Sequence, residues 1–140
     1  MKRVRFSVKT EEHVRFADVD SMGHVNNAVY LSYFEQARVA FFKKLSALDL
    51  RFMDSKSAFG FIVAEIAVQF LSPAYLDETM VVKIRVAEIR NKAFRFEYEI
   101  ADKKTKRLVA RGHSVQVMYN YKKNLSFPIP VDLRKKMQNL

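Results

Sequence analysis

Apolar residues recur every three or four positions in one stretch of the first third of the chain. The repeat is made by Tyr30, Phe34, Ala37, Phe41 and Leu45, with Leu31 and Val39 widening the apolar face. This spacing predicts one long helix from about Ala28 to Leu45. Asn26 and Asn27 precede it, and short amide side chains cap a helix by accepting free N–H groups of its first turn.

Elsewhere the pattern alternates with a period of two, which is typical of half-buried strands. One such segment precedes the helix at Arg3–Phe16, and four follow at Phe61–Phe70, Met80–Ile89, Phe94–Ile100 and Arg107–Tyr119. In the first of these four we expect one face to carry Ile62, Ala64, Ile66, Val68 and Phe70. A loop is predicted at Ser46–Phe59, polar turns at Arg90–Lys92 and Asp102–Lys106, and a short helix at Val131–Met137.

One long helix among several strands predicts an α+β fold. Because the helix is apolar around most of its circumference, we expect a curled antiparallel sheet of about five strands wrapped around it. We expect residues 1–140 to form one domain, with long sheet edges that pairing in a homodimer would protect.

The composition and the distribution of apolar residues exclude several kinds of site and segment. The 140 residues include no cysteine, so disulfides and thiolate metal sites are excluded, and the three histidines lack ligand spacing. The basic start is not followed by an apolar run, and no segment reaches the roughly 20 apolar residues that span a bilayer. We therefore expect a cytoplasmic protein with no metal, no cofactor and no membrane segment.

The net charge of +10 is placed unevenly. Residues 83–140 hold fifteen Lys and Arg against five Asp and Glu, whereas residues 1–82 hold ten of each. Such a surplus favours a polyanionic partner, either a nucleic acid or a phosphorylated nucleotide. Nucleic-acid binders interleave exposed aromatics with basic residues. Here Phe94, Phe96 and Tyr98 all fall on the apolar face, so we do not expect a nucleic acid.

The polar turn before the predicted helix is the best candidate for chemistry. It holds Asp18, Asp20, Gly23 and His24, and Gly23 is suited to a positive φ angle. Backbone N–H groups at a helix start, with the positive end of its dipole, can hold a developing oxyanion. A carboxylate just ahead of such a start suggests acyl chemistry.

The segment D-x-D-x-x-G-H-V-N-N-x-x-Y-x-x-Y-x-E-x-A-R, from Asp18 to Arg38, resembles the signature of hotdog-fold acyl-CoA thioesterases. The resemblance is to the group of 4-hydroxybenzoyl-CoA thioesterase and YbgC, and it continues through Phe70–Glu78, Arg90–Phe94 and Ala110–Pro130. It implies a hotdog fold, a homo-oligomer that forms a tetramer from dimers, and hydrolysis of an acyl-CoA substrate. The benzoyl-CoA enzyme is hydrophobic at the positions of His24 and Asn26, so its acyl preference is not transferred.

The resemblance also implies roles for particular residues. Asp20 becomes the catalytic carboxylate, acting as general base or as nucleophile, and the Asn27 N–H polarises the thioester carbonyl. Arg90 and Lys92, with Asn91, become contacts for the coenzyme A phosphates, which suits their chemistry. We expect His24 and Tyr30 to line the substrate site.

Several alternatives remain open. Asp18 is interpreted as structural, Glu35 and Arg38 as a helix ion pair, and Glu65 as a reserve catalytic carboxylate. The substrate could instead be an acyl group on acyl carrier protein. The chain could also be a non-catalytic module that binds acyl-CoA.

Overall fold

A computed structural model of the chain describes residues 5–46 and 59–140. Its strands are β1 (Val8–His13), β2 (Phe59–Phe70), β3 (Thr79–Ile89), β4 (Ala93–Asp102), β5 (Leu108–Asn120) and β6 (Leu125–Ser126). Its helices are α1 (Val29–Ser46), α2 (Val131–Gln138) and a 3₁₀ turn at Phe16–Asp18. The predicted loop at Ser46–Phe59 lies almost wholly outside the described residues.

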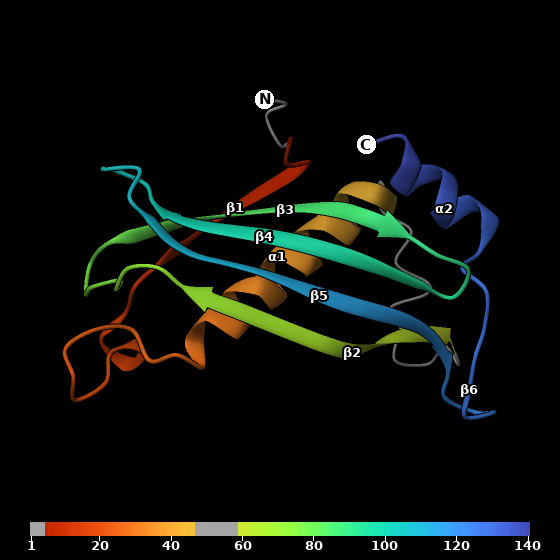
Figure 1. Cartoon of the computed structure of the whole chain (residues 1–140), viewed down its shortest axis with the longest axis horizontal. Helices are drawn as coiled ribbons and strands as arrows, with labels where there is room; N and C mark the ends of the chain where they lie inside the picture. Colours follow the sequence, from red (N-terminus) through yellow and green to blue (C-terminus); the bar gives the residue numbers. More distant parts are fainter. Residues whose placement is uncertain (1–4, 47–58) are drawn as a thin grey trace.

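The strands form one antiparallel sheet in the order β1-β3-β4-β5-β2, with β6 pairing the end of β5. Helix α1 crosses one face of this sheet diagonally, and α2 lies beside the end of α1 (Figure 1). The predicted α+β fold is therefore confirmed, and it has the hotdog shape that the resemblance implied. β2 and β1 are the two edge strands.

Aromatic side chains of α1 and β4 fill the space between the helix and the sheet. Phe34 stacks on Tyr98 with ring centroids 4.1 Å apart, and Phe41 meets Phe96 edge-on at 4.8 Å. All four are at most 2% exposed, as is Phe94. Such aromatic burial dominates core energetics. It also confirms that the aromatics of β4 face the core.

Gly112 permits this close packing of the helix on the sheet. A Cβ at this position would lie 2.4 Å from the Ala67 carbonyl oxygen and 2.6 Å from the Phe34 ring. Neither the backbone of the adjacent strand β2 nor the buried ring can move that far in a dense core. A glycine is therefore required at position 112 because a side chain would collide with β2 and Phe34, and not because of its backbone conformation.

Two strand predictions need correction. Of the predicted strand Arg3–Phe16, Arg3 and Val4 lie outside the described residues, and β1 covers only Val8–His13. Phe16 belongs instead to the 3₁₀ turn, where the side chain of Asp18 accepts the Arg15 N–H. In β2, the pairing with β5 shifts between Val63 and Glu65. The shift exchanges the two faces, so Ile66 and Val68 pack on the core while Ile62 is exposed.

Candidate active site

The polar turn before α1 is a closed loop. Val19 and Val25 form an isolated antiparallel bridge, and the Asp20 N–H donates to the His24 carbonyl at 3.1 Å. The Asp20 carboxylate accepts the Met22 N–H at 2.8 Å, and Gly23 has a φ of 87°, as predicted. The loop holds Asp20, which is partly exposed, at a fixed place ahead of the helix.

Asn26 and Asn27 play different parts at the start of α1. The Asn26 side chain accepts the Ala28 N–H at 2.9 Å, and its carbonyl accepts the Val29 N–H at 2.9 Å. The predicted cap is therefore made by Asn26. Among the described residues the Asn27 N–H has no acceptor, so it is available to a ligand.

A cavity of about 240 Å³ lies at the start of α1, with Asn27 in its lining. One side is lined by residues of the helix start, which are His24, Val25, Asn27 and Tyr30, and the other by Phe70, Leu71, Ser72 and Pro73. Asp20 is not among the lining residues, but its hydrogen bond to His24 joins it to one that is. The structure thus places His24, Asn27 and Tyr30 in the lining of the cavity and Asp20 in the adjoining loop.

His24 and Tyr30 lie at the cavity in different ways. His24 Nδ1 is 3.3 Å from the Val25 carbonyl oxygen, so this turn histidine is oriented by the backbone. Tyr30 is 2% exposed and meets the Phe70 ring edge-on at 5.2 Å. Burial raises the pKa of the Tyr30 phenol, which keeps it neutral. The two aromatic rings of Tyr30 and Phe70 are therefore in contact within the cavity lining.

Asp18 has the structural role that its place in the turn suggested. Its carboxylate accepts the Arg15 backbone N–H at 2.9 Å, and the Arg15 guanidinium donates at 2.9 and 3.3 Å. The side-chain hydrogen bond from Arg15 lowers the pKa of this carboxyl. Because Asp18 is 4% exposed, it is not available to a substrate.

Asp18→Asn is expected to reduce the free energy of unfolding at pH 7 by about 2 kcal/mol, because it weakens hydrogen bonds to a charged group. A carboxyl with a lowered pKa contributes stability above its ordinary value of 3.8 and loses it as the pH falls below that value. The difference between wild type and variant should therefore shrink below about pH 4. Urea denaturation at pH 7 and pH 3 measures it, and an equal difference at both would contradict this role.

Arg90, Asn91 and Lys92 form the turn between β3 and β4, at the opposite end of the sheet (Figure 1). β3 starts beside the loop that holds Asp20 and runs for 11 residues before this turn. At about 3.3 Å per residue, the turn lies roughly 30 Å or more from Asp20 of the same chain. Arg90 is exposed and pairs with Glu88 at 2.8 Å. One chain therefore does not bring these residues to the cavity.

Two further interpretations concern Glu65 and Arg38. Glu65 lies on the outer face of the sheet, where it pairs with His113 at 2.8 Å, so it is not beside the cavity. Arg38 is 9% exposed and donates to the Tyr98 hydroxyl at 3.0 Å, whereas Glu35 is exposed. The helix ion pair is replaced by a contact inside the core, because Arg38 lies on the buried side of α1.

The wall formed by Phe70–Pro73 is the part of the site that sequence reasoning missed. The local pattern at Ser72 and Pro73 indicates only the end of a strand. The structure places them opposite the helix start, and a carbonyl of the same segment, Ala74 O, accepts the Val25 N–H at 2.9 Å. The family resemblance could have indicated this wall, since the segment is within the stretch Phe70–Glu78 that continues the resemblance.

Within residues 5–46 and 59–140, no group of three His, Asp or Glu side chains is arranged to hold a metal ion. Neither described helix is long and apolar enough to cross a membrane.

Comparison with known proteins shows the family of the chain. Residues 14–137 match the sequence profile of the thioesterase-like superfamily. The acyl-CoA thioesterase YbgC of Haemophilus influenzae is 28% identical over 87 residues, which cover 62% of this chain and 63% of that protein. The chain thus matches less than two thirds of the length of this curated relative.

Solved structures match over nearly the whole chain. A thioesterase from Thermus thermophilus, solved with coenzyme A and zinc, is 30% identical with a TM-score of 0.82, covering 96% of this chain and 93% of that one. The BH1999 gentisyl-coenzyme A thioesterase is 26% identical with a TM-score of 0.80, and the match covers 91% of this chain and 99% of that one. With its profile match, its fold and its helix-start cavity, the chain belongs to the thioesterase-like superfamily.

Proposed function

We propose that this protein hydrolyses an acyl-CoA to the free carboxylic acid and coenzyme A. The observation that carries the proposal is that Asn27, whose N–H has no acceptor among the described residues, lines a cavity at the start of α1 beside a loop that holds a carboxylate. A free N–H at a helix start stabilises an oxyanion where charge develops in acyl transfer. The superfamily, and the relatives that act on coenzyme A thioesters, support the same activity.

In this proposal the thioester carbonyl oxygen accepts the Asn27 N–H. Asp20 then either removes a proton from the water that attacks the carbonyl carbon, or attacks that carbon itself and forms an anhydride that water opens. In both routes the C–S bond breaks and the coenzyme A thiolate takes up a proton. The acyl group lies against Tyr30 and Phe70, which are the apolar side of the cavity.

The coenzyme A phosphates are proposed to bind Arg90 and Lys92 of a second copy of the chain. The β2 edge supports this arrangement, since it is long and exposes Ile62, Val63 and Phe70 by 37–46%. An exposed apolar edge strand is a ready surface for pairing with another chain. We therefore propose a homodimer in which two β2 edges pair.

The register of β2 supports the proposed arrangement of the two copies. β2 ends at Phe70, which lines the cavity, and its start is level with the Arg90–Lys92 turn, because Phe61 pairs with Met118 and the Met118 N–H donates to Lys92 O. In an antiparallel two-fold pairing, the end of one strand lies beside the start of the other. The cavity of one copy would then lie near the basic turn of its partner.

A thiol-release screen across acyl-CoA esters of different chain length, branching and aromaticity tests the proposed activity. We expect release of coenzyme A together with an equal amount of free acid for at least one class of ester. The second arm of the screen uses the same acyl groups attached to acyl carrier protein. Faster hydrolysis in this arm would identify acyl-[acyl carrier protein], and not acyl-CoA, as the preferred substrate. Binding of acyl-CoA without turnover in either arm would contradict the proposal.

A further inference from the structure

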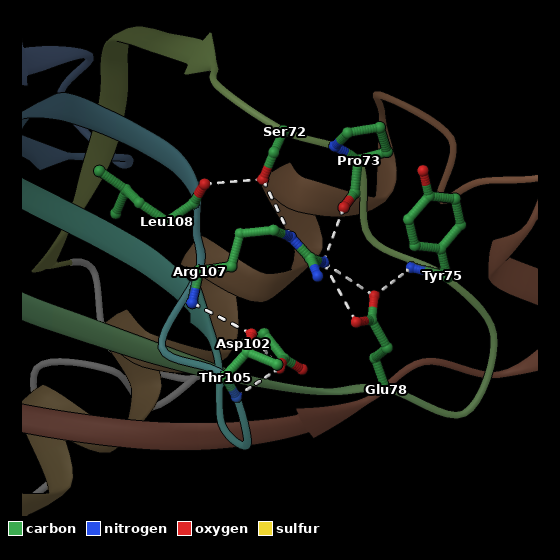
Figure 2. A network of polar contacts seen from close by, with 8 residues as sticks. All are labelled: Ser72, Pro73, Tyr75, Glu78, Asp102, Thr105, Arg107 and Leu108. Carbon is green, nitrogen blue, oxygen red and sulfur yellow. Dashed lines mark hydrogen bonds and ion pairs between the residues drawn. The ribbon is translucent and has the colours of Figure 1, made fainter.

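Arg107 binds the segment that forms one wall of the cavity (Figure 2). Its Nε donates to Ser72 Oγ at 3.2 Å, and its Nη2 donates to the Pro73 carbonyl at 2.9 Å. The same Nη2 lies 3.0 and 3.1 Å from the two carboxylate oxygens of Glu78. One guanidinium therefore holds both ends of the connection between β2 and β3.

The groups around Arg107 are themselves held in place. Glu78 accepts the Tyr75 N–H at 2.7 Å, and Ser72 Oγ donates to the Leu108 carbonyl at 2.7 Å (Figure 2). The side chains of Arg107 and Glu78 are only 34% and 21% exposed. Partial burial with several hydrogen bonds makes this pair firmer than an exposed surface ion pair.

The same segment meets the loop that holds Asp20. Ser72 and Pro73 line the cavity opposite His24 and Asn27, and the next carbonyl, Ala74 O, accepts the Val25 N–H at 2.9 Å. A shift of this segment would therefore change both the width of the cavity and the support of the chain that leads to Asn27. In acyl transfer a misplacement of about 1 Å can cost on the order of a hundredfold in rate.

We propose that Arg107 is a positioning residue for the reaction at this cavity. By holding Ser72 and Pro73, it sets the distance between the two walls, and so it determines how well an acyl group is aligned with the Asn27 N–H. Arg107 acts through the segment and does not contact the substrate. The inference rests on the proposed thioesterase function.

Arg107→Lys separates positioning from general stabilisation. A lysine ammonium can still pair with Glu78, but as a point charge it cannot reproduce the planar fork that reaches Ser72 and Pro73 as well. We expect thermal stability close to wild type and kcat lowered about tenfold, with inhibition by free coenzyme A unchanged within about twofold. The matched control is Arg111→Lys, because Arg111 is exposed in β5, the strand that directly follows Arg107. We expect the kcat of this control to equal that of wild type.

Hydrogen exchange gives a readout that does not depend on turnover. The Val25 amide is protected by Ala74 O, so we expect it to exchange faster in Arg107→Lys than in wild type or Arg111→Lys. If Arg107→Lys does not fold, Ser72→Ala serves instead. It removes one acceptor of Arg107 and also the hydrogen bond from Ser72 Oγ to the Leu108 carbonyl, while Pro73 and Glu78 still accept from Arg107. We expect changes in the same direction but smaller, about threefold in kcat.

The outcomes distinguish this inference from the function on which it rests. Suppose that the wild type hydrolyses acyl-CoA and that Arg107→Lys has the wild-type kcat and unchanged exchange at Val25. This result would overturn the positioning role of Arg107 and leave the proposed function unaffected. Wild type without hydrolysis of any ester would overturn the function itself. Reduced kcat with faster Val25 exchange supports the role of Arg107.

Discussion

Asp20→Asn is expected to lower kcat for acyl-CoA hydrolysis by a factor of about 100 or more, the loss typical when a general base or nucleophile is disabled. The asparagine keeps the shape of the side chain and its acceptor oxygen, which can still accept the Met22 N–H that Asp20 accepts at 2.8 Å. It loses the negative charge that activates water or attacks the carbonyl. Steady-state thiol release with the best ester of the screen measures the change.

Asp132→Asn is the matched control for this variant. Asp132 is exposed in the first turn of α2, away from the cavity, so the same change of charge there should leave kcat as in wild type. Circular dichroism and thermal unfolding of both variants check that the fold is intact. Asp20→Asn with undiminished activity would remove this carboxylate from the proposed chemistry.

Mixing two inactive or weakened chains is expected to restore activity. In the proposed homodimer, two Asp20→Asn chains lack the carboxylate in both sites, and two Arg90→Met, Lys92→Met chains lack the proposed phosphate contacts in both sites. For the second variant we expect KM to rise about tenfold or more, since hydrogen bonds to charged groups are worth about 1.5–3 kcal/mol. If each site combines Asp20 of one chain with the basic turn of its partner, one site of the mixed dimer contains all of these residues.

Co-expression of the two variants with different affinity tags allows the mixed dimer to be purified. We expect about half of the wild-type kcat per dimer, with the wild-type KM. The control is a mixed dimer of two differently tagged Asp20→Asn chains, which should remain inactive. If the basic turn served the cavity of its own chain, the mixed dimer would keep the raised KM, and the proposed arrangement would be wrong.

Local patterns predicted the elements on which the site is built. The helical repeat gave α1 within one residue at each end, and strict alternation gave the buried face of β4. The Asn26 cap and the positive φ of Gly23 are equally local, because each depends on neighbours two or three residues away. These features could be predicted since they need no knowledge of what packs against them.

Features that depend on distant partners were missed. Alternation cannot reveal the shift between Val63 and Glu65 in β2, because a bulge is defined by its pairing strand. Helical spacing predicts that Arg38 pairs with Glu35, but its partner Tyr98 is 60 residues away in the sequence. The contacts of Arg107 likewise span 29 to 35 residues. The wall of the cavity could therefore be described only from the folded chain.

In the proposed reaction, the Asn27 N–H donates a hydrogen bond to the carbonyl oxygen of a bound thioester. The direct test is a ¹⁵N–¹H NMR titration of the wild-type protein with a coenzyme A ketone, in which a methylene replaces the thioester sulfur so that the carbonyl remains but cannot be hydrolysed. We expect a downfield shift of the Asn27 amide proton at saturation, because it gains an acceptor that it otherwise lacks. An unshifted Asn27 amide, with changes confined to the outer face of the sheet, would contradict the account.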